Sequence, residues 1–588
     1  MITLLDILIS NLKTSPDHPS FWAKRKQTFE PITNSQMAES IVSFSLGLKS
    51  LGIMENQHVA IVSNNRPEWV ITDFSVMGLG ACLVPVYPTL SAADIAFILN
   101  DSESTIVVVE TKAHLDHILS IKKECLKLTH IIFMGEALED REKGVTLFSE
   151  VTAVGDVCTP EERHTIKMGW AKIEPNRLAT IVYTSGTTSK SKGVCLTHQN
   201  VMSNVADILK VLPITASDVV LSFLPLSHVF ERTAGYYTVL AAGGMIYYAE
   251  SIASVSDDMR LAHPTVVVSV PRLYEKVQAS MLATATGVKS VILRLALRVG
   301  RAYRLTSQPG MGLRCAHQVM NRLVYSKLRY KLGGRLRFFV SGGAPLRKDL
   351  AEFFCDLGVV IIEGYGMTET SPVLTCNHLD HYQFGSVGLV LPSVQLKLGA
   401  QDELLAKGPS MTTGYWNRPD ATAELLDADG WLHTGDVAKI DQAGFVTIVD
   451  RIKELIVLSN GKKVPPQVIE SQIKANRLVA QVMVIGDNRS YLTALVVPNM
   501  DELKKHPCAA GWNGQNSAEF LNQKKVTASI EREVISTLSG FSEYEKVKKC
   551  RLLAEEWSIE TGELTPSLKV KRKVVLEKYK ELIETMYG

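Results

Sequence analysis

Short apolar runs alternate with longer amphipathic stretches through the first half of the chain. The runs HVAIVSNN at 58–65, CLVPVYP at 82–88 and TIVVVE at 105–110 are separated by the amphipathic stretches 67–81 and 91–102. Apolar runs of this length predict strands, and the stretches between them predict helices. Their alternation predicts parallel βαβ units, so we expect an α/β fold.

The same rhythm returns later at residues 336–345, 347–358 and 359–366. Glycine-rich turns follow the two apolar runs immediately, and open α/β sheets bind ligands where strands end. Beyond Asp450 the composition shifts to a shorter region with a lysine-rich tail. We therefore predict a large domain at 1–450 and a small domain at 451–588.

Length and composition support more than one packed core. The 588 residues exceed what one core usually holds, and 46% of them are hydrophobic. A net charge of +2 gives no general reason to expect a nucleic-acid partner. Nine cysteines without paired spacing favour reduced thiols in the cytoplasm. Asp6 interrupts the first apolar run, which argues against a secretion signal, and the uncharged stretch 233–249 is shorter than a membrane span.

Residues 178–201 read LATIVYTSGTTSKSKGVCLTHQNV. An apolar run opens into a loop of Thr, Ser and Gly that carries Lys190 and Lys192, and we expect a helix capped by Thr197 to follow. Small residues let backbone N–H groups approach phosphate oxygens, and lysine adds charge. Ser191 stands where a Walker loop needs glycine, so this is another kind of phosphate loop or a flexible surface loop.

The stretches YTSGTT and KGV resemble the phosphate loop of the adenylate-forming superfamily, which includes acyl-CoA synthetases, luciferases and peptide-synthetase adenylation domains. Further stretches follow in the family's order: LPLSHVFERT at 224, SGGAPL at 341, EGYGMTET at 363, GWLHTGD at 430, DRIKELI at 450 and LTPSLKVKR at 564. The resemblance covers nearly the whole chain. It implies a large N-terminal domain of βαβ-type sheets that binds AMP and the acyl group, and a small mobile α+β C-terminal domain.

The resemblance assigns most nucleotide contacts. The ATP phosphates would be held by Thr184, Ser185, Gly186, Thr187, Thr188 and Lys192. Ser189 and Ser191 depart from the family's usual glycine and proline, which puts loop stiffness in question. The rest of the nucleotide would meet Gly343, Ala344, Pro345, Glu363, Gly364, Tyr365, Gly366, Met367, Thr368, Asp436 and Arg451. Within this set Tyr365 would stack on adenine, Asp436 would accept the ribose hydroxyls, and Arg451 would lie beside the ribose.

The resemblance also implies the catalytic groups. Glu369 and Thr184 would hold Mg²⁺, which prefers oxygen ligands, whereas Glu369 alone could be an exposed loop residue. His228 would border the acyl pocket, although a histidine after an apolar run is often structural. Lys569 would enter the active site from the small domain, the alternative being a solvated basic helix. Rotation would occur about Asp450 and Lys453.

Two other clusters invite an interpretation. The group Cys376, His378 and His381 fits no common zinc spacing well. Residues 276–348 contain no Asp or Glu, and the arginines at 294, 298, 301 and 304 have helical spacing. We expect them to line one helix face that attracts anionic lipid or an acidic carrier protein, or else to be partly paired within the protein.

These features predict a long-chain fatty acid–CoA ligase that uses ATP and Mg²⁺ with coenzyme A as substrate. The long-chain class is indicated by LPLSHVFERT, by PRLYEKV at 271–277 and by the long segment before Gly333. One alternative is a fatty acyl-AMP ligase or acyl-carrier-protein synthetase, because a carrier protein presents the same thiol as CoA. Another is a nucleotide- or lipid-binding protein that keeps the fold without catalysis. We expect a cytoplasmic protein, with the inner face of the membrane as a peripheral site.

Overall fold

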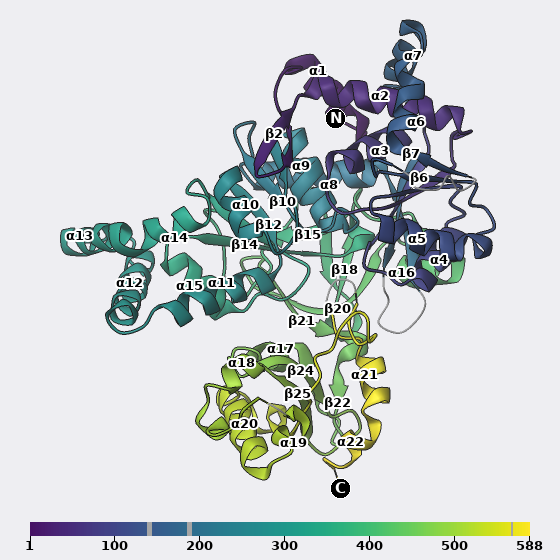
Figure 1. Ribbon diagram of the computed structural model, residues 1–588. Helices are drawn as coiled ribbons and strands as arrows, with labels where there is room; N and C mark the ends of the chain where they lie inside the picture. The colour runs from purple at the N-terminus through teal and green to yellow at the C-terminus, as the bar shows by residue number, and fades with distance from the viewer. Residues whose placement is uncertain (138–143, 185–190, 515, 566–568, 588) are drawn as a thin grey trace.

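The computed structural model describes residues 1–137, 144–184, 191–514, 516–565 and 569–587. Figure 1 shows a large N-terminal part and, below it, a smaller part that holds the C-terminal helices. Separate hydrophobic cores fill the two parts, and the core of the smaller one includes Ile456, Val484 and Val496. The whole is an α/β fold, as the sequence predicts.

The first large sheet is built on the predicted βαβ rhythm. The apolar runs form β3 (His58–Val62), β4 (Cys82–Val86) and β5 (Ile106–Val109), which pair in parallel. The stretches between them form α3 (Pro67–Gly78) and α4 (Ala92–Asp101), which confirms those predictions. The sheet order is β19-β9-β8-β4-β3-β5-β6-β7, where the other strands are β6 (His130–Phe133), β7 (Val145–Leu147), β8 (Leu178–Thr184), β9 (Lys192–Thr197) and β19 (Gly414–Tyr415).

The second large sheet contains the later rhythm. Its strands β13 (Phe338–Ser341) and β14 (Val360–Gly366) pair in parallel, and α15 (Lys348–Asp356) connects them. The order is β16-β15-β14-β13-β12-β10-β11-β1-β2. The other strands are β1 (Phe21–Arg25), β2 (Thr28–Ile32), β10 (Val219–Ser222), β11 (Met245–Tyr248), β12 (Val266–Ser269), β15 (Val373–Cys376) and β16 (Leu389–Val390).

Smaller sheets lie toward and within the C-terminal part. One has the order β17-β18-β20-β21, with β17 (Gln395–Leu398), β18 (Glu403–Lys407), β20 (Leu432–Ile440) and β21 (Val446–Arg451). The C-terminal sheet has the order β24-β25-β26, with β24 (Val479–Ile485), β25 (Leu492–Pro498) and β26 (Val547–Leu552). A short ladder joins β22 (Ile456–Val457) to β23 (Lys463–Val464).

Helices cover the faces of these sheets. In the large part they are α1 (Leu5–Thr14), α2 (Asn34–Ser50), α5 (Lys112–Ile121), α6 (Phe148–Asp156), α7 (Pro160–Trp170), α8 (His198–Val211), α9 (Thr238–Ala241), α10 (Val255–Ala262), α11 (Pro271–Thr284), α12 (Val288–Leu305), α13 (Met311–Met320), α14 (Ser326–Lys331) and α16 (Pro419–Leu425). In the small part they are α17 (Pro466–Ile473), α18 (Met500–Leu503), α19 (Ser517–Leu521), α20 (Lys524–Thr537), α21 (Arg572–Lys578) and α22 (Lys580–Glu584). The predicted cap is confirmed, because the Thr197 hydroxyl accepts from the backbone N–H of Asn200 at 3.1 Å where α8 begins.

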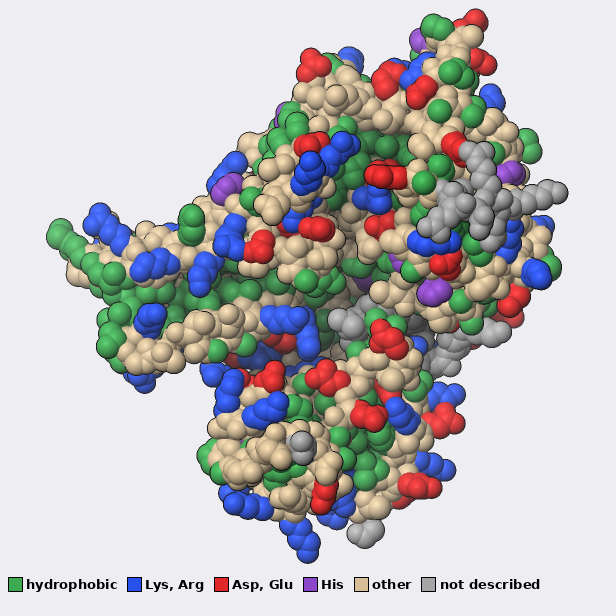
Figure 2. Space-filling model, in the orientation of Figure 1, with side chains coloured by type: hydrophobic (Ala, Val, Ile, Leu, Met, Phe, Trp, Pro, Cys, Tyr) green, Lys and Arg blue, Asp and Glu red, His purple; other side chains and the backbone are tan. Residues whose placement is uncertain are grey.

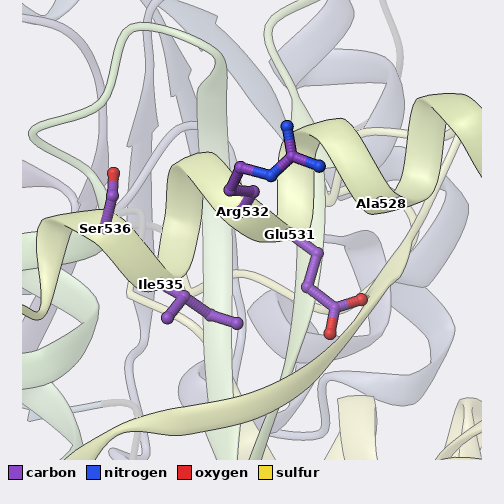
Figure 3. A pocket seen from close by; sticks show the side chains of 5 residues that line it. All are labelled: Ala528, Glu531, Arg532, Ile535 and Ser536. Carbon is purple, nitrogen blue, oxygen red and sulfur yellow. The ribbon is translucent and has the colours of Figure 1, made fainter.

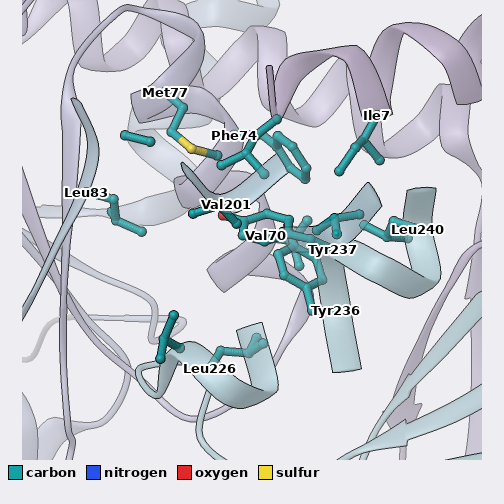
Figure 4. Packing of buried hydrophobic residues seen from close by; sticks show 14 of the residues in the cluster. Ile7, Val70, Phe74, Met77, Leu83, Val201, Leu226, Tyr236, Tyr237 and Leu240 are labelled. Atoms are coloured by element: carbon teal, nitrogen blue, oxygen red, sulfur yellow. The ribbon is translucent and has the colours of Figure 1, made fainter. Parts of the chain in front are cut away.

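Large aromatic side chains fill the space where α1, α3, α8 and α9 meet. Figure 4 shows Tyr236 and Tyr237 packed against Phe74 and Val70. Both tyrosines belong to a π-helix, η2 (Glu231–Tyr237), and are fully buried. The uncharged stretch 233–249 is therefore mainly core, as its length and composition predict. Among the described residues, no helix has both the length and the apolar character needed to cross a membrane.

A buried ion pair ties η2 to α3. The Arg232 guanidinium contacts the Asp73 carboxylate, and it also donates to the Thr180 hydroxyl at 2.8 Å. The Tyr237 hydroxyl donates to the other oxygen of Asp73 at 2.7 Å. The Arg232 and Asp73 side chains are only 3% and 0% exposed. Because each charge is shielded from water, each depends on the other for compensation.

We expect Asp73→Ala to destabilise the large part by about 3–5 kcal/mol, because it leaves the Arg232 charge buried and unpaired. Urea unfolding followed by tryptophan fluorescence measures the loss. The double variant Asp73→Ala with Arg232→Met should be less destabilised than Asp73→Ala alone, since it removes the stranded charge. Equal stability of Asp73→Ala and the parent would contradict the importance assigned to this pair.

Candidate active site

The two ends of the predicted phosphate loop meet as neighbouring strands. Thr184 ends β8, Lys192 begins β9, and the two residues pair in an antiparallel ladder. The strand β9 therefore lies between the loop and α8, whereas the sequence predicted only a helix after the loop. The apolar residues of β9 are those of the segment GVCL. The loop residues Ser185, Gly186, Thr187, Thr188 and Ser189 lie outside the described residues.

Glu369 lies close to this hairpin. It belongs to a single 3₁₀ turn that follows β14, and its side chain is buried rather than exposed. Burial raises the pKa of its carboxyl group, while a hydrogen bond from Tyr415 and the charges of Arg451 and Lys192 oppose the rise. Lys192 is thus near enough to act on Glu369 electrostatically.

Tyr415 links Glu369 and Lys192, and it lies in none of the motifs recognised in the sequence. Its hydroxyl donates to Oε1 of Glu369 at 2.8 Å. The Lys192 ammonium lies over the same ring, 4.9 Å from its centroid. The contact depends on β19, which carries Tyr415 and pairs with β9 from a distant part of the chain. Tyr415 is therefore placed to orient Glu369 and Lys192 together.

The donor set around Glu369 fits a divalent cation. Within the described residues no salt bridge neutralises the buried Glu369 carboxylate. Thr184, which ends β8 and pairs with Lys192, supplies a hydroxyl oxygen. Oxygen donors of this kind suit Mg²⁺, which also takes phosphate oxygens as ligands. Glu369 and Thr184 are the residues that would hold the ion.

We expect Tyr415→Phe to lower the rate of adenylate formation about tenfold at limiting Mg²⁺, because it removes one hydrogen bond to a charged group. The ring under Lys192 remains in this variant, so Tyr415→Ala should cost more. Pyrophosphate release measured across a Mg²⁺ titration tests both. A Tyr415→Phe profile that superimposes on the parent's would show that the phenol plays no part in placing Glu369.

The predicted adenine loop follows β13. Gly343, Ala344 and Pro345 are exposed, and Gly343 has a φ of 75°, which favours glycine. Oε1 of Glu363 accepts from the Leu346 backbone N–H at 3.1 Å, so this residue fastens the loop to β14. Burial raises the pKa of Glu363 to about 8.

The segment after Glu363 is shaped by close backbone approach. A Cβ atom on Gly366 would fall 1.7 Å from the Pro372 carbonyl oxygen, so only glycine fits there. The Met367 backbone N–H donates to the same oxygen at 3.0 Å. Gly364, Met367 and Thr368 are partly exposed beside the exposed loop, so they remain candidates for nucleotide contact.

The predicted ribose site is a three-residue cluster. The Tyr365 hydroxyl donates to Oδ2 of Asp436 at 2.5 Å, and Nε of Arg451 lies 3.3 Å from Oδ1. Burial raises the pKa of Asp436, and the charge of Arg451 works against that rise. Tyr365 precedes Asp436 by 71 positions and Arg451 follows it on the next strand, so β14, β20 and β21 bring the three residues together.

Lys569 reaches this cluster from the C-terminal part. In Figure 1 the yellow segment that precedes α21 rises toward β20. Loss of surrounding water lowers the pKa of Lys569, the Arg451 charge lowers it further, and Asp436 opposes both. The residue is not on the basic helix, because α21 begins at Arg572. The Thr565 backbone N–H donates to the Lys569 carbonyl at 2.8 Å, and the Lys569 backbone N–H donates to the Thr565 hydroxyl at 3.1 Å.

His228 is a second group within electrostatic range of Lys569. Burial and the Lys569 charge lower the pKa of His228 to about 4, so the imidazole is neutral near pH 7. Its Nδ1 accepts from the Phe230 backbone N–H at 3.1 Å. A neutral ring fixed in this way is suited to line the site where a carboxylate substrate meets Lys569.

The predicted hinge joins the two parts. The Asp450 carboxylate is buried and accepts from the backbone N–H groups of Arg451 at 2.7 Å and Gln467 at 3.1 Å. Gln467 lies in the first turn of α17, so Asp450 links β21 to the small part. Burial raises its pKa to about 7. Lys453 lies in a short exposed 3₁₀ turn beyond it.

Two other features add nothing to this site. The described residues contain no cluster of three or more His, Cys, Asp or Glu side chains that could hold a metal, so Cys376, His378 and His381 do not form a zinc site. Figure 3 shows a pocket of about 500 Å³ on α20, lined by residues such as Glu531 and Arg532. None of the predicted residues lines it.

Comparisons with known proteins identify the family of this chain. Residues 10–416 match the family described as AMP-binding enzyme, and residues 453–588 match the AMP-binding enzyme C-terminal domain. The chain is similar to the long-chain-fatty-acid–CoA ligase FadD15 of Mycobacterium bovis, with 33% identity over 98% of this chain and 95% of that protein. It is 30% identical to the human long-chain-fatty-acid–CoA ligase 6 over 100% of this chain and 87% of that protein.

A solved structure shares the fold. The A domain of carboxylic acid reductase from Segniliparus rugosus, in complex with AMP and a co-purified carboxylic acid, superposes with a TM-score of 0.76. The two chains are 22% identical, and the match covers 100% of this chain and 94% of that one. The family match and the identity over full-length relatives show that this chain belongs to the AMP-binding enzymes.

Proposed function

We propose that the protein is a long-chain fatty acid–CoA ligase that forms an acyl-adenylate and then a thioester. The observation that supports the proposal is the cluster in which the Tyr365 hydroxyl and the Arg451 guanidinium contact Asp436, with Lys569 of the small part close enough for its charge to oppose the burial-driven rise in the pKa of Asp436. The long-chain class follows from relatives that bear this name and match nearly their full length.

In the first half-reaction a carboxylate oxygen of the fatty acid attacks the α-phosphorus of ATP. The bond to pyrophosphate breaks, and an acyl–AMP anhydride forms. Lys192 faces the phosphates, and Asp436 with Arg451 faces the ribose. Lys569 offsets charge that develops on the carboxylate and phosphate oxygens. Bound Mg²⁺ would neutralise phosphate charge, and Glu369 and Thr184 would hold it.

In the second half-reaction the thiol sulfur of CoA attacks the acyl carbonyl carbon. AMP leaves with the bonding electrons, and the thiol proton passes to solvent. Rotation about Asp450 and Lys453, at the boundary between domains 1–450 and 451–588, would move Lys569 out and admit the thiol. One contact between the parts, the hydrogen bond from the Lys463 ammonium to the Gln401 side-chain oxygen at 3.0 Å, would break during such a rotation.

The location of the enzyme is part of the proposal. Nine free cysteines suit a reducing cytoplasm, and the fatty acid substrate partitions into lipid, so we place the enzyme in the cytoplasm with peripheral contact at the inner face of the membrane.

Pyrophosphate release with ATP, Mg²⁺ and palmitate tests the first half-reaction. Release above background is expected, and its absence would leave a protein that only binds nucleotide or lipid. A panel of acids, run with CoA and with an acyl carrier protein, tests the second step. Consumption of the adenylate by carrier protein but not by CoA would identify an acyl-carrier-protein ligase instead.

A further inference from the structure

An arm made of α12 and α13 extends from the large part, at the left of Figure 1. Its inner side is fixed by packing. A Cβ atom on Gly300 would fall 1.7 Å from the Asp356 carbonyl oxygen, so α12 lies directly against α15. The Arg304 guanidinium pairs with Asp356 at 2.8 Å, and the Tyr325 hydroxyl donates to the Ala296 carbonyl at 2.7 Å.

This packing corrects the predicted arginine face. Arg304 turns inward, whereas Arg294, Arg298 and Arg301 remain exposed on the outer side of α12. Within the described residues none of these three takes part in a salt bridge. Residues 276–348 contain no acid of their own, so on α12 only Arg304 is neutralised by a carboxylate from outside this segment, and the charges of the three outer arginines are left unpaired among the described residues.

Large apolar side chains share the outer face with the arginines. On α12, Val288 is 75% exposed, Val291 57% and Leu295 47%, and their spacing places them along one stripe beside the arginines. The neighbouring helix adds Met311 at 83%. Figure 2 shows green and blue side chains, and no red ones, over this arm. A soluble protein usually keeps so many apolar groups from gathering on one exposed surface.

We propose that the outer face of α12 and α13 docks the enzyme on an anionic lipid bilayer. Exposed cations attract anionic headgroups, and valine and leucine side chains on the same face enter the boundary between headgroups and acyl chains. Arginine stems add apolar contact while the guanidinium groups stay at the headgroups. An acidic protein would satisfy the arginines but would leave the apolar stripe unexplained, so the bilayer fits both features.

Sedimentation with vesicles tests the proposal without relying on catalysis. The parent should bind vesicles of equimolar phosphatidylglycerol and phosphatidylcholine at low salt, and bind pure phosphatidylcholine much more weakly. Replacing Arg294, Arg298 and Arg301 by alanine together should weaken binding to the anionic vesicles on the order of 100-fold and reduce its salt dependence. Val291→Ser with Leu295→Ser should weaken binding about tenfold at every salt concentration.

A matched control removes three exposed lysines from the small part, at Lys504, Lys524 and Lys525, where no large hydrophobic side chain is exposed nearby. This control carries the same loss of charge and should bind like the parent. Thermal midpoints establish that each variant is folded. If the variant without the three arginines does not fold, the double variant Val291→Ser with Leu295→Ser still tests the arm. The proposal is wrong if the parent ignores anionic vesicles at low salt, if the control loses as much binding as the arginine variant, or if an acidic carrier protein alone binds through these arginines.

Discussion

Replacing Lys569 by alanine is expected to slow adenylate formation roughly 100-fold or more, because a positive charge that meets developing negative charge in a water-poor site supplies several kcal/mol of transition-state stabilisation. The charge of this ammonium opposes the burial-driven rise in the pKa of Asp436 and adds to the burial-driven fall in the pKa of His228, so Lys569 lies within electrostatic range of the two groups. Nucleotide binding should change much less, since Lys569 is not among the groups that we assign to the phosphates or the base.

The second half-reaction gives the sharper comparison. If the small domain rotates before the thiol attacks, Lys569 is absent from that step, and the variant should convert ready-made acyl-AMP and CoA to acyl-CoA at nearly the parent rate. Single-turnover measurements of the two steps decide this. Lys573→Ala, an exposed lysine on α21, is the matched control and should change neither step. An equal loss in both steps of a folded Lys569→Ala variant would refute the two-orientation mechanism.

The sheet strands follow from local pattern far more readily than the sheet order does. Residues 59–62 and 82–86 are continuously apolar because helices cover both faces of a parallel sheet, and that signal is present in the sequence itself. The pairing of β1 with β11, however, joins Phe21 to Ile246. No local pattern encodes a contact of that separation, so the edges of the sheets could not be predicted.

Some residues of the candidate site could be predicted from the sequence, and others could not. Asp436, Glu369 and Lys569 lie in recognisable motifs, and the structure brings them into one region. Tyr415 lacks such a signal, because its importance comes from a ladder between β19 and β9 that only the folded chain creates. Its phenol looks like any half-buried tyrosine until Glu369 and Lys192 are placed against it.

Arg304 shows how a correct helix can still mislead. The prediction of a helix through the arginines holds, since α12 spans Val288–Leu305. Each step of three residues falls short of a full helical turn by about 60°. Two such steps, from Arg298 to Arg301 and on to Arg304, turn the last side chain toward the body of the protein, where Asp356 receives it.

Replacing Glu369 by glutamine is expected to reduce Mg²⁺-dependent adenylate formation by orders of magnitude while leaving the fold intact. The amide keeps nearly the same volume and can still accept the hydrogen bond from Tyr415, but it is a much weaker ligand for a hard cation. Glu161→Gln, on the exposed surface of α7, is a matched control that should behave like the parent.

The Glu369→Gln variant should lose activity without losing stability in the absence of ligand. Burial raises the pKa of the Glu369 carboxyl above its unfolded value, so without a cation the protein loses stability as pH rises through that interval and the buried group ionises. Glutamine has no charge to bury, so the variant without ligand should unfold at the same temperature as the parent near pH 7 or at a higher one. Mg²⁺ with ATP should raise the thermal midpoint of the parent more than that of the variant, because binding to the native state stabilises it by mass action. Full activity at limiting Mg²⁺, together with an undiminished thermal shift, would remove Glu369 from the metal site and leave its burial to be explained by packing alone.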